Sequence, residues 1–506
     1  MPPVDELHRA EIHQIIGSDP ERNSKERRPG AADGDGLPGA AAFPPDWEET
    51  GRRVEYLYRE YSLLVRTPAL DRVRDELSLR FVRDFDVPES QLPALIDEVG
   101  VIEGVTRLTW PAERGLPTTP TLLDGYDVDS GEATEGREDA EGTEGREAGR
   151  VPGLDETLGV RVATPDHVLY LCGHPCPATE PEEVPGSAIP FPAVSTGLCC
   201  GTAEDCRPQR VCDGVGVFVS IVDSGLLKEA SADHIWLNGV EGDLDDAVVN
   251  GQIRHYSCHG TFVAGCVRCT APKASIYVES TPADHREAET GAAYETDVVL
   301  KMGQTLDRGP DIIVCEFNGE TRKNIPLVSF DALYESRIRP LKGLVVLVPA
   351  GNEGTRVPAW PAAHTWVISV GALSANWRTR ASFSNYGGWV DVYAPGEDLV
   401  NAFATGGYEC IEDPNAGVHR NFTGMAKWSG TSFSTPLVAG LIAARMSATG
   451  ENAPQAADAL LHLARRQALP GVGPVLFPDQ PGCDLDPPRP SGCSCHPSPH
   501  CQCGRH

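Results

Sequence analysis

The hydrophobic positions of this chain follow two kinds of pattern. Between about residues 214 and 466, short apolar runs recur, as in Val215–Val222, Asp311–Phe317 and Gly343–Val348. A continuous run rich in β-branched residues is typical of a strand that is buried on both faces. Because these runs alternate with helical stretches, the pattern predicts an α/β fold with a mainly parallel sheet covered by helices on both sides.

One helical stretch is apolar all round. The segment S-G-T-S-F-S-T-P-L-V-A-G occupies residues 429–440, and small polar residues lead into a run that continues to Ala444. A helix of this kind belongs in the core of a large domain. Ser432 would then lie at the N-terminus of a buried helix, where backbone N–H groups favour negative charge. By itself this serine is as well explained as a helix cap.

The first third of the chain has a different character. Residues 1–46 are rich in charged residues, Gly, Pro and Ala, and they are expected to be disordered. Residues 47–123 predict a small α+β module. Its elements are expected at Tyr61–Thr67 (strand), from Pro68 (helix), at Gln91–Val99 (helix) and at Gly104–Trp110 (strand).

The remaining boundaries follow from composition. Residues 124–160 are expected to form an acidic, disordered linker, in which T-E-G-R-E occurs at both 134–138 and 143–147. Residues 161–211 are read as a Cys- and Pro-rich connecting segment with a strand at His167–Cys172. The α/β domain is expected at 212–466, followed by a Pro-, Cys- and His-rich tail at 467–506.

Composition narrows the partners and the compartment. The net charge of −30 over 506 residues argues against nucleic acid or an anionic membrane as a partner. The N-terminus lacks the basic and apolar regions of a signal peptide, so the expected location is the cytoplasm, with unconventional export as the alternative. The 16 cysteines are then expected to be mostly reduced thiols or metal ligands.

Four polar residues of the α/β domain form a chemically coherent set. Asp223 ends the first strand, His259 opens a helix, and Asn352 follows a buried strand in a Gly-rich turn. A serine hydroxyl needs a base such as His259 to remove its proton, and the imidazole needs a carboxylate to fix its tautomer. The Asn352 amide and the Ser432 N–H could stabilise an oxyanion. Each residue alone has an ordinary structural explanation.

Together, the Asp…His…Asn…Ser order and its flanking sequences resemble the subtilisin-like serine proteases. The most specific motifs are H-G-T-F-V-A-G at 259–265 and the segment around Ser432, and the resemblance covers residues 212–466. It implies a three-layer α/β/α domain that needs no cofactor for catalysis and cleaves protein or peptide substrates. It also implies Asp223, His259 and Ser432 as the catalytic triad and Asn352 as the oxyanion donor.

The predicted substrate-binding residues are where the chain departs from this family. The stretch C-E-F-N-G at 315–319 replaces the usual Ser-Leu-Gly-Gly, so that the expected lining is Glu316, Phe317 and Asn318, with Gly351 nearby. An extended substrate would still pair with this strand through its main chain. Asn318 in place of glycine predicts restricted specificity, and Glu316 would favour basic substrates unless it faces outward or is salt-bridged. The acidic cluster E-G-D-L-D-D at 241–246 is read as a solvated loop.

Two flanking features leave other functions open. The module at 47–123 matches an inhibitory prodomain or an accessory domain, and an inhibitory contact with the catalytic domain is one expectation. The tail contains weak zinc-ligand candidates at Cys493, Cys495, His496, Cys501 and Cys503. The alternatives to a protease are therefore a non-catalytic binding module of the same fold and a metal-binding protein.

Overall fold

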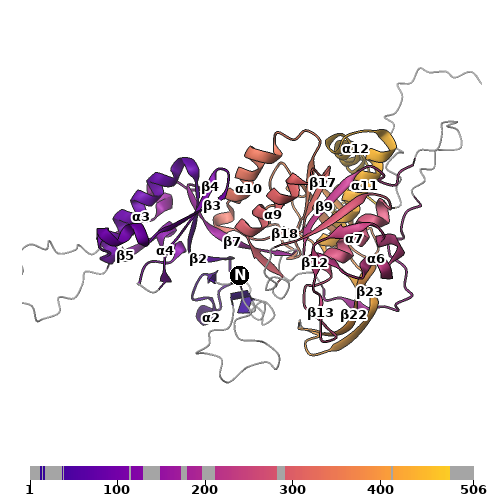
Figure 1. The fold of residues 1–506 in the computed structure, drawn as a ribbon, viewed down its shortest axis with the longest axis horizontal. Helices are drawn as coiled ribbons and strands as arrows, with labels where there is room; N and C mark the ends of the chain where they lie inside the picture. The colour runs from indigo at the N-terminus through magenta and orange to yellow at the C-terminus, as the bar shows by residue number, and fades with distance from the viewer. Residues whose placement is uncertain are drawn as a thin grey trace, which may run out of the picture.

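The computed structural model describes residues 12–13, 15–16, 37, 39–112, 115–128, 149–171, 179–196, 211–281, 291–411 and 414–478. Within these ranges the strands build three larger sheets and two short two-stranded pairs. The N-terminal part, drawn in indigo and purple in Figure 1, lies at one end of the molecule, and the later elements lie at the other. Most of the segments predicted to be disordered, and all five tail ligand candidates, lie outside the described residues.

The predicted parallel sheet forms the centre of the second part. Its strands, in spatial order, are β11 (Val240–Gly242), β15 (Ser275–Ser280), β9 (Phe218–Asp223), β17 (Ile312–Cys315), β19 (Val345–Pro349), β20 (Ile368–Leu373) and β21 (Val392–Pro395). Every neighbouring pair is parallel. The α/β fold class with a mainly parallel sheet is thereby confirmed.

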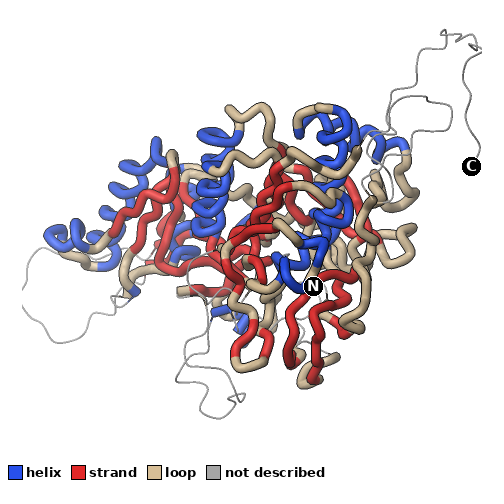
Figure 2. Tube along the Cα trace, turned by 45° about the vertical axis from the view of Figure 1, so that its right-hand side comes forward, coloured by secondary structure: helices blue, strands red, loops and turns tan. Residues whose placement is uncertain are grey.

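Helices cover this sheet on both faces, which explains the apolar runs (Figure 2). On β9, Val219 and Ile221 pack in one core cluster with the helices α7 (His259–Thr270), α11 (Thr431–Thr449) and α12 (Ala453–Arg466). Val222 packs in the other cluster, against α9 (Glu295–Asp307) and α10 (Val328–Leu333). Because successive side chains of a strand point to opposite faces, both sets must be apolar, and three layers result.

Helices α7 and α11 lie against each other on one face of the sheet. The two backbones come close at Gly440, where an added Cβ would lie 2.0 Å from Thr270 Oγ1 and 2.8 Å from the Val267 carbonyl oxygen. All twelve residues of α7 are buried, as are residues 431–446 of α11. The all-round apolar pattern around Ser432 therefore reflects burial on every side.

The N-terminal part is built on an antiparallel sheet. Its strands are β2 (Tyr56–Arg66), β4 (Val105–Thr109), β3 (Asp97–Ile102) and β7 (Ala163–Leu171), and β1 (Ala40–Phe43) pairs with β2. Strand β1 lies within the segment that was predicted to be disordered, so that prediction was wrong at its end. The long helix here is α3 (Leu70–Phe85), with α2 (Trp47–Thr50) before the sheet.

Two sequence predictions fail in this part. The helix expected at Gln91–Val99 is a 3₁₀ segment, η2 (Glu89–Ala94), followed by β3. Pro93 lies inside the predicted helix and lacks the N–H that a helix interior requires. The predicted linker was also too wide, because its described ends form β5 (Gly125–Val128), β6 (Gly149–Pro152) and α5 (Leu154–Leu158), next to α4 (Thr119–Asp124).

Strand β7 connects the two parts of the molecule. It was expected to be a short strand of a connecting segment, but its first half pairs with β2 as a member of the N-terminal sheet. Its second half pairs with β16 (Ala292–Tyr294) and β18 (Phe317–Asn318), which belong to the second part. The N-terminal sheet therefore continues directly into the parallel-sheet region.

The remaining elements surround the parallel sheet. A five-stranded sheet contains β13 (Val248–Val249), β14 (Gln252–Ile253), β22 (Leu399–Glu409), β23 (His419–Trp428) and β8 (Glu182–Glu183), while β10 (Leu226–Leu227) pairs with β12 (Leu244–Asp245). Short helical segments here are α6 (Ala230–Asp233), η4 (Ile235–Leu237), η5 (Arg322–Asn324) and η6 (Tyr334–Ile338), and η1 (Thr67–Ala69) precedes α3 in the N-terminal part. In the described ranges, no helix combines the length and the apolarity that a membrane span would need.

Candidate active site

Asp223 is the last residue of β9, in the interior of the parallel sheet. Sites in open α/β sheets lie at the carboxyl ends of the strands, and this residue lies at that edge. Its side chain is fully buried, and Oδ1 accepts a 2.6 Å hydrogen bond from the Ser224 N–H. A carboxylate buried in this way is costly unless hydrogen bonds or a counter-charge compensate it.

His259 provides that compensation as the first residue of α7. Its Nδ1 lies 2.8 Å from Asp223 Oδ2 and 2.9 Å from Oδ1. Nδ1 therefore donates to the carboxylate, which fixes the imidazole tautomer and leaves Nε2 on the opposite side of the ring. The ring is held by aromatic contacts, with centroid distances of 5.3 Å to Phe433 and 5.7 Å to Trp428.

Ser432 is the second residue of α11, next to the phenylalanine that contacts the imidazole. The helix cap is Gly430 and makes no side-chain cap bond, so Ser432 does not serve as the cap that the sequence allowed. Its hydroxyl is buried and has no hydrogen-bond partner among the described residues. An uncommitted hydroxyl at a helix N-terminus, one residue before the phenylalanine that contacts the imidazole, is suited to nucleophilic attack.

Asn352 follows β19 and is tied to the start of α11. Its Oδ1 accepts hydrogen bonds from both the N–H and the hydroxyl of Thr431, each at 3.0 Å. The Thr431 hydroxyl in turn accepts from the Gly351 N–H at 3.2 Å. Because Oδ1 must face these donors, the orientation of the amide is determined, and its NH₂ group points away from Thr431. The structure thus brings Asn352 next to the residue that precedes Ser432.

The cysteines around the site are not arranged as nucleophiles. Cys258, directly before His259, is a fully buried free thiol. Burial, together with the nearby Asp245 carboxyl, raises its pKa well above the ordinary range. Burial also raises the pKa of Cys315, at the end of β17, to about 12. Since the thiolate is the reactive form of cysteine, these groups are inert at neutral pH.

Of the predicted substrate-binding residues, Phe317 and Asn318 form β18, Glu316 directly precedes it, and Gly351 follows β19. Phe317 packs in the core cluster that contains Leu169 and Leu171 of β7, and Asn318 Nδ2 donates to the Pro349 carbonyl at 2.9 Å. Glu316 is completely buried, so it does not face outward. Gly351 has a φ of +97°, and an added Cβ would lie 2.5 Å from Asn385 Nδ2. The role of these residues in substrate binding stays a prediction.

Strand β7 occupies the position between β16 and β18. Tyr170 is paired with Ala292 of β16 and with Asn318 of β18, and the Leu171 N–H donates to the Gly291 carbonyl at 2.8 Å. The side chains of Leu169 and Leu171 point into the core of the second part. Strand β7 of the same chain is therefore already paired, through its main chain, with β18, the strand that was predicted to line the substrate.

Sequence reasoning missed three residues that support this site: Ser224, Thr431 and Asp245. Ser224 and Thr431 flank predicted site residues, and only their hydrogen bonds distinguish them from ordinary turn and helix residues. Asp245 belongs to the cluster that was read as a solvated loop. That reading was wrong for this residue, because Asp245 is in β12 and only 4% exposed.

Metal ligation finds no support in the part of the chain that the structure describes. No group of three or more His, Cys, Asp or Glu side chains is placed there to hold an ion. The tail candidates Cys493, Cys495, His496, Cys501 and Cys503 lie outside the described residues, so zinc binding by the tail stays a prediction.

Comparisons with known proteins agree with the geometry. A model described as "Subtilase family" matches residues 214–472. The chain is 29% identical over 250 residues to a thermophilic serine proteinase of Bacillus sp. (strain AK1), covering 47% of this chain and 53% of that protein. It is 28% identical to thermitase of Thermoactinomyces vulgaris, covering 48% of this chain and 79% of that protein. The chain thus spans about half the length of the first of these relatives.

Solved structures are also similar. The structure of a cold-adapted subtilisin-like serine proteinase matches with 22% identity and a TM-score of 0.39, over 52% of this chain and 89% of that one. The self-cleaved protease domain of PatA matches with 25% identity and a TM-score of 0.37, over 50% and 89% of the two chains.

Proposed function

This chain belongs to the subtilase family, and on that premise we propose that it is a serine endopeptidase that cleaves peptide bonds through an acyl-enzyme at Ser432. The observation that carries the proposal is the Asp223–His259 pair at 2.8 Å, whose imidazole contacts Phe433, together with the buried hydroxyl of the adjacent Ser432, which makes no hydrogen bond among the described residues. Proteins or peptides are then the substrates.

In the first step, His259 Nε2 takes the proton of the Ser432 hydroxyl as Oγ attacks the scissile carbonyl carbon. The imidazolium that forms is stabilised by Asp223, whose carboxylate already accepts from Nδ1. The carbonyl oxygen becomes an oxyanion, and the Asn352 NH₂ and the N-terminus of α11 are the donors for it. His259 then gives its proton to the leaving amine, and water releases the acyl group by the reverse sequence.

Restricted specificity is part of the proposal. Asn318 and Glu316 replace small residues of the family pattern, and both side chains are buried at the strand that would pair with substrate. The Asn318 amide is anchored to the Pro349 carbonyl, so it does not move aside freely. A side chain fixed at this place narrows the space available to the substrate residue that faces it.

We also propose that the N-terminal part inhibits the site through β7. An extended substrate would need the main-chain groups of β18, and Tyr170 and Leu171 already pair with them, while β16 holds the other side of β7. The apolar side chains of Leu169 and Leu171 add buried contacts. Hydrolysis would then require release or removal of β7.

A fluorophosphonate probe, which reacts with activated serines, tests the catalytic assignment. The wild-type protein should be labelled at Ser432, slowly in the full chain and faster after limited proteolysis of the N-terminal part. Ser432→Ala should abolish labelling. Ser434→Ala is the matched control, because Ser434 lies on the same helix and donates to the Ala394 carbonyl instead. Folded wild-type protein that stays unlabelled at every stage of trimming would contradict the proposed function.

A further inference from the structure

A second buried carboxylate lies behind the proposed catalytic pair. Asp245 is on β12, which pairs with the strand β10 that follows Asp223, in the register Leu227↔Asp245. The residue is 4% exposed, whereas its neighbour Asp246 is exposed. A carboxyl group is rarely buried unless its position has a use, because removing it from water is unfavourable.

The hydrogen bonds of Asp245 all lead to the residues around His259. Its Oδ2 accepts from the Cys258 N–H at 2.6 Å and from the Ser224 hydroxyl at 3.3 Å. Ser224 Oγ accepts from the Gly260 N–H at 3.2 Å. The backbone on both sides of His259 is thus held by one carboxylate, directly through Cys258 and indirectly through Ser224.

The start of α7 needs such support. Cys258 has a left-handed backbone with φ of +67° and makes no side-chain cap bond, so its N–H is satisfied by Asp245 rather than by the helix. Gly260 is packed against the strand, since an added Cβ would lie 2.4 Å from the Gly225 carbonyl oxygen. A small shift of this turn would move the imidazole relative to both Asp223 and Ser432.

Asp245 also contributes charge. Burial, and then the neighbouring Asp223 carboxylate, raise the pKa of Asp245 to about 7, although hydrogen bonds from the Cys258 N–H and from the Ser224 and Ser257 side chains oppose the shift. The ionisable groups nearest to this carboxyl are Asp223, His259 at the start of α7 and Cys258 directly before it, and Asp243 of its own segment is paired with Lys301.

We propose that Asp245 is a positioning residue of this active site, which fixes the start of α7 and adds a second negative charge behind Asp223 that favours the imidazolium form of His259. This inference rests on the proposed function, because it assigns Asp245 a part in the same reaction. Asp245 does not touch substrate and acts through Cys258, Ser224 and Asp223.

Kinetics of three variants separate the two contributions. Asp245→Asn keeps an acceptor for the Cys258 N–H and removes the charge, Asp245→Ala removes both, and Asp246→Asn makes the same change one residue away on an exposed side chain. We expect kcat to fall by about 10-fold in Asp245→Asn and about 10²-fold in Asp245→Ala, with KM nearly unchanged, because misplacement of a catalytic group affects the transition state most. Asp246→Asn should match the wild type.

The pH–rate profile gives a readout that a purely structural residue would not change. The ionised form of Asp245 favours the imidazolium, and loss of that charge in Asp245→Asn should move the acid limb of kcat to lower pH. Identical kcat values and identical acid limbs in the wild type and Asp245→Asn would overturn the proposal.

The same negative charge that favours the imidazolium should lower the stability of the fold. A carboxyl whose pKa is raised by folding binds a proton in the folded state that the unfolded state releases, so stability falls as the pH rises from the ordinary aspartate value through about 7. The Ser432→Ala background prevents self-digestion. In it, the Tm of Asp245→Asn minus the Tm of the protein that retains Asp245 should increase from pH 4 to pH 8.

NMR of ¹³C-labelled histidine in the same Ser432→Ala background separates this proposal from the proposed function. The His259 resonance should titrate at a lower pH in Asp245→Asn, by about half a unit or more, whether or not the protein hydrolyses peptides. If the wild-type protein neither hydrolyses peptides nor reacts with the fluorophosphonate probe, but the His259 shift is observed, the protease assignment is overturned and the positioning role stays intact. An unchanged His259 titration would overturn the positioning role.

Discussion

Two contact regions of this molecule are stabilised by different interactions. The first is the helix pair α7–α11, which carries His259 and Ser432 and consists almost entirely of buried apolar and small residues. The second, which we call the seam, joins the N-terminal part to the parallel-sheet part through charged residues. The seam consists of Arg59, Arg66, Asp124, Asp155, Arg161, Asp166 and His167 on one side and Glu295, Asp297, Arg322, Lys323, Asp331 and Glu335 on the other.

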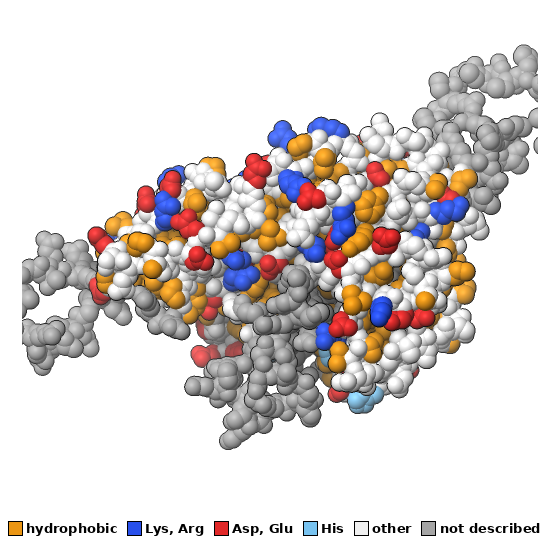
Figure 3. All heavy atoms as spheres, in the orientation of Figure 1, with side chains coloured by type: hydrophobic (Ala, Val, Ile, Leu, Met, Phe, Trp, Pro, Cys, Tyr) orange, Lys and Arg blue, Asp and Glu red, His pale blue; other side chains and the backbone are white. Residues whose placement is uncertain are grey.

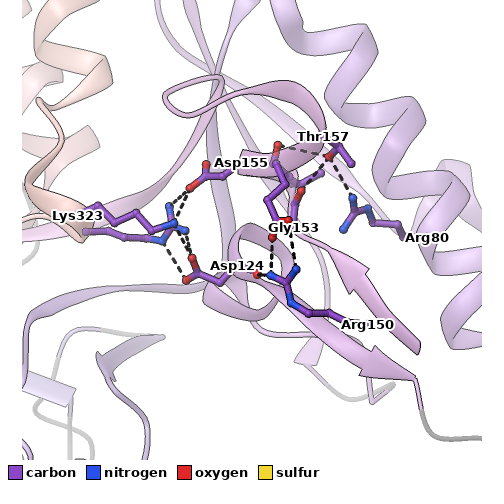
Figure 4. A network of polar contacts seen from close by, with 10 residues as sticks. Arg80, Asp124, Arg150, Gly153, Asp155, Thr157 and Lys323 are labelled. Carbon is purple, nitrogen blue, oxygen red and sulfur yellow. Dashed lines mark hydrogen bonds and ion pairs between the residues drawn. The ribbon is translucent and has the colours of Figure 1, made fainter. Parts of the chain in front are cut away.

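The contacts of the seam are ion pairs and hydrogen bonds, and they surround the apolar contacts that Leu169 and Leu171 make with the second part. Arg322 is only 3% exposed and pairs with Asp124 and Asp155, and Lys323 reaches the same two carboxylates (Figure 4). His167 is buried between one carboxylate and one backbone donor: its Nδ1 lies 3.1 Å from Glu295 Oε2, and its Nε2 accepts from the Arg322 N–H. Basic and acidic side chains are also interspersed on the face drawn in Figure 3.

The difference matches the roles proposed for the two regions. Apolar close packing has little dependence on salt or pH, so it keeps the distance between nucleophile and base constant. Ion pairs and hydrogen bonds at a domain junction weaken when water, salt or protons reach them. A contact that must hold a strand in the site and later release it is better built from the second kind.

The largest effect is expected from the buried arginine of the seam. Arg322→Met should weaken the docking of the N-terminal part by about 3–5 kcal/mol, because it leaves Asp155, which is 6% exposed, with a weaker counter-charge. Lys323→Met is the matched control. It contacts the same carboxylates from a 49% exposed position and should cost about 1 kcal/mol or less.

Hydrogen exchange of residues 163–171 measures this effect directly. The Leu171 N–H, which donates to Gly291, should exchange much faster in Arg322→Met, and fluorophosphonate labelling of the full chain should accelerate in parallel. Similar exchange rates in the two variants would show that burial of the arginine is not what holds β7 in place.

The next effect concerns the helix pair. Gly440→Ala places a Cβ 2.0 Å from Thr270 Oγ1 and 2.8 Å from a backbone oxygen, and we expect a loss of about 1–3 kcal/mol in unfolding free energy. Gly303→Ala is the matched control on α9, where the nearest atom is Arg337 Nη1 at 3.7 Å. That change should be neutral or stabilising by about 0.5–1 kcal/mol.

Urea unfolding in the Ser432→Ala background compares the two glycine variants. Exchange at β7 should stay unchanged in Gly440→Ala, because the helix pair does not form the seam. Equal stability of the two variants would mean that α7 and α11 can separate without cost, which the proposed geometry does not allow.

Much of the parallel-sheet part could be predicted from the sequence. Strands such as β9 and β19 are buried on both faces, so their apolar runs are continuous and unambiguous. Asp223, His259, Asn352 and Ser432 were recognisable because each follows or begins such an element. Their packing could be foreseen only in outline, since Thr431 and Phe433 act through contacts between segments distant in sequence.

The N-terminal part was harder to predict for a physical reason. Strand β7 was recognised at His167–Cys172, but its partners β2, β16 and β18 lie far away along the chain, and no local pattern specifies such pairing. Asp245 was missed for a similar reason. Its burial depends on the pairing of β12 with β10, whereas its neighbours Glu241 and Asp246 are as exposed as the composition suggests.

The smallest effect is expected at the exposed rim of the seam. Glu335, 59% exposed, pairs with Arg66 at 3.0 Å, and Glu335→Gln should cost about 0.5 kcal/mol in low salt and still less at high ionic strength. Asp331→Asn is the comparison, because Asp331 is 18% exposed and contacts both Arg66 and Arg161. Asp331→Asn should lower the unfolding free energy in urea, and raise the hydrogen-exchange rate of β7, more than Glu335→Gln does. If Glu335→Gln had the larger effect, the cohesion of the seam would lie at its rim, and added salt alone would release β7.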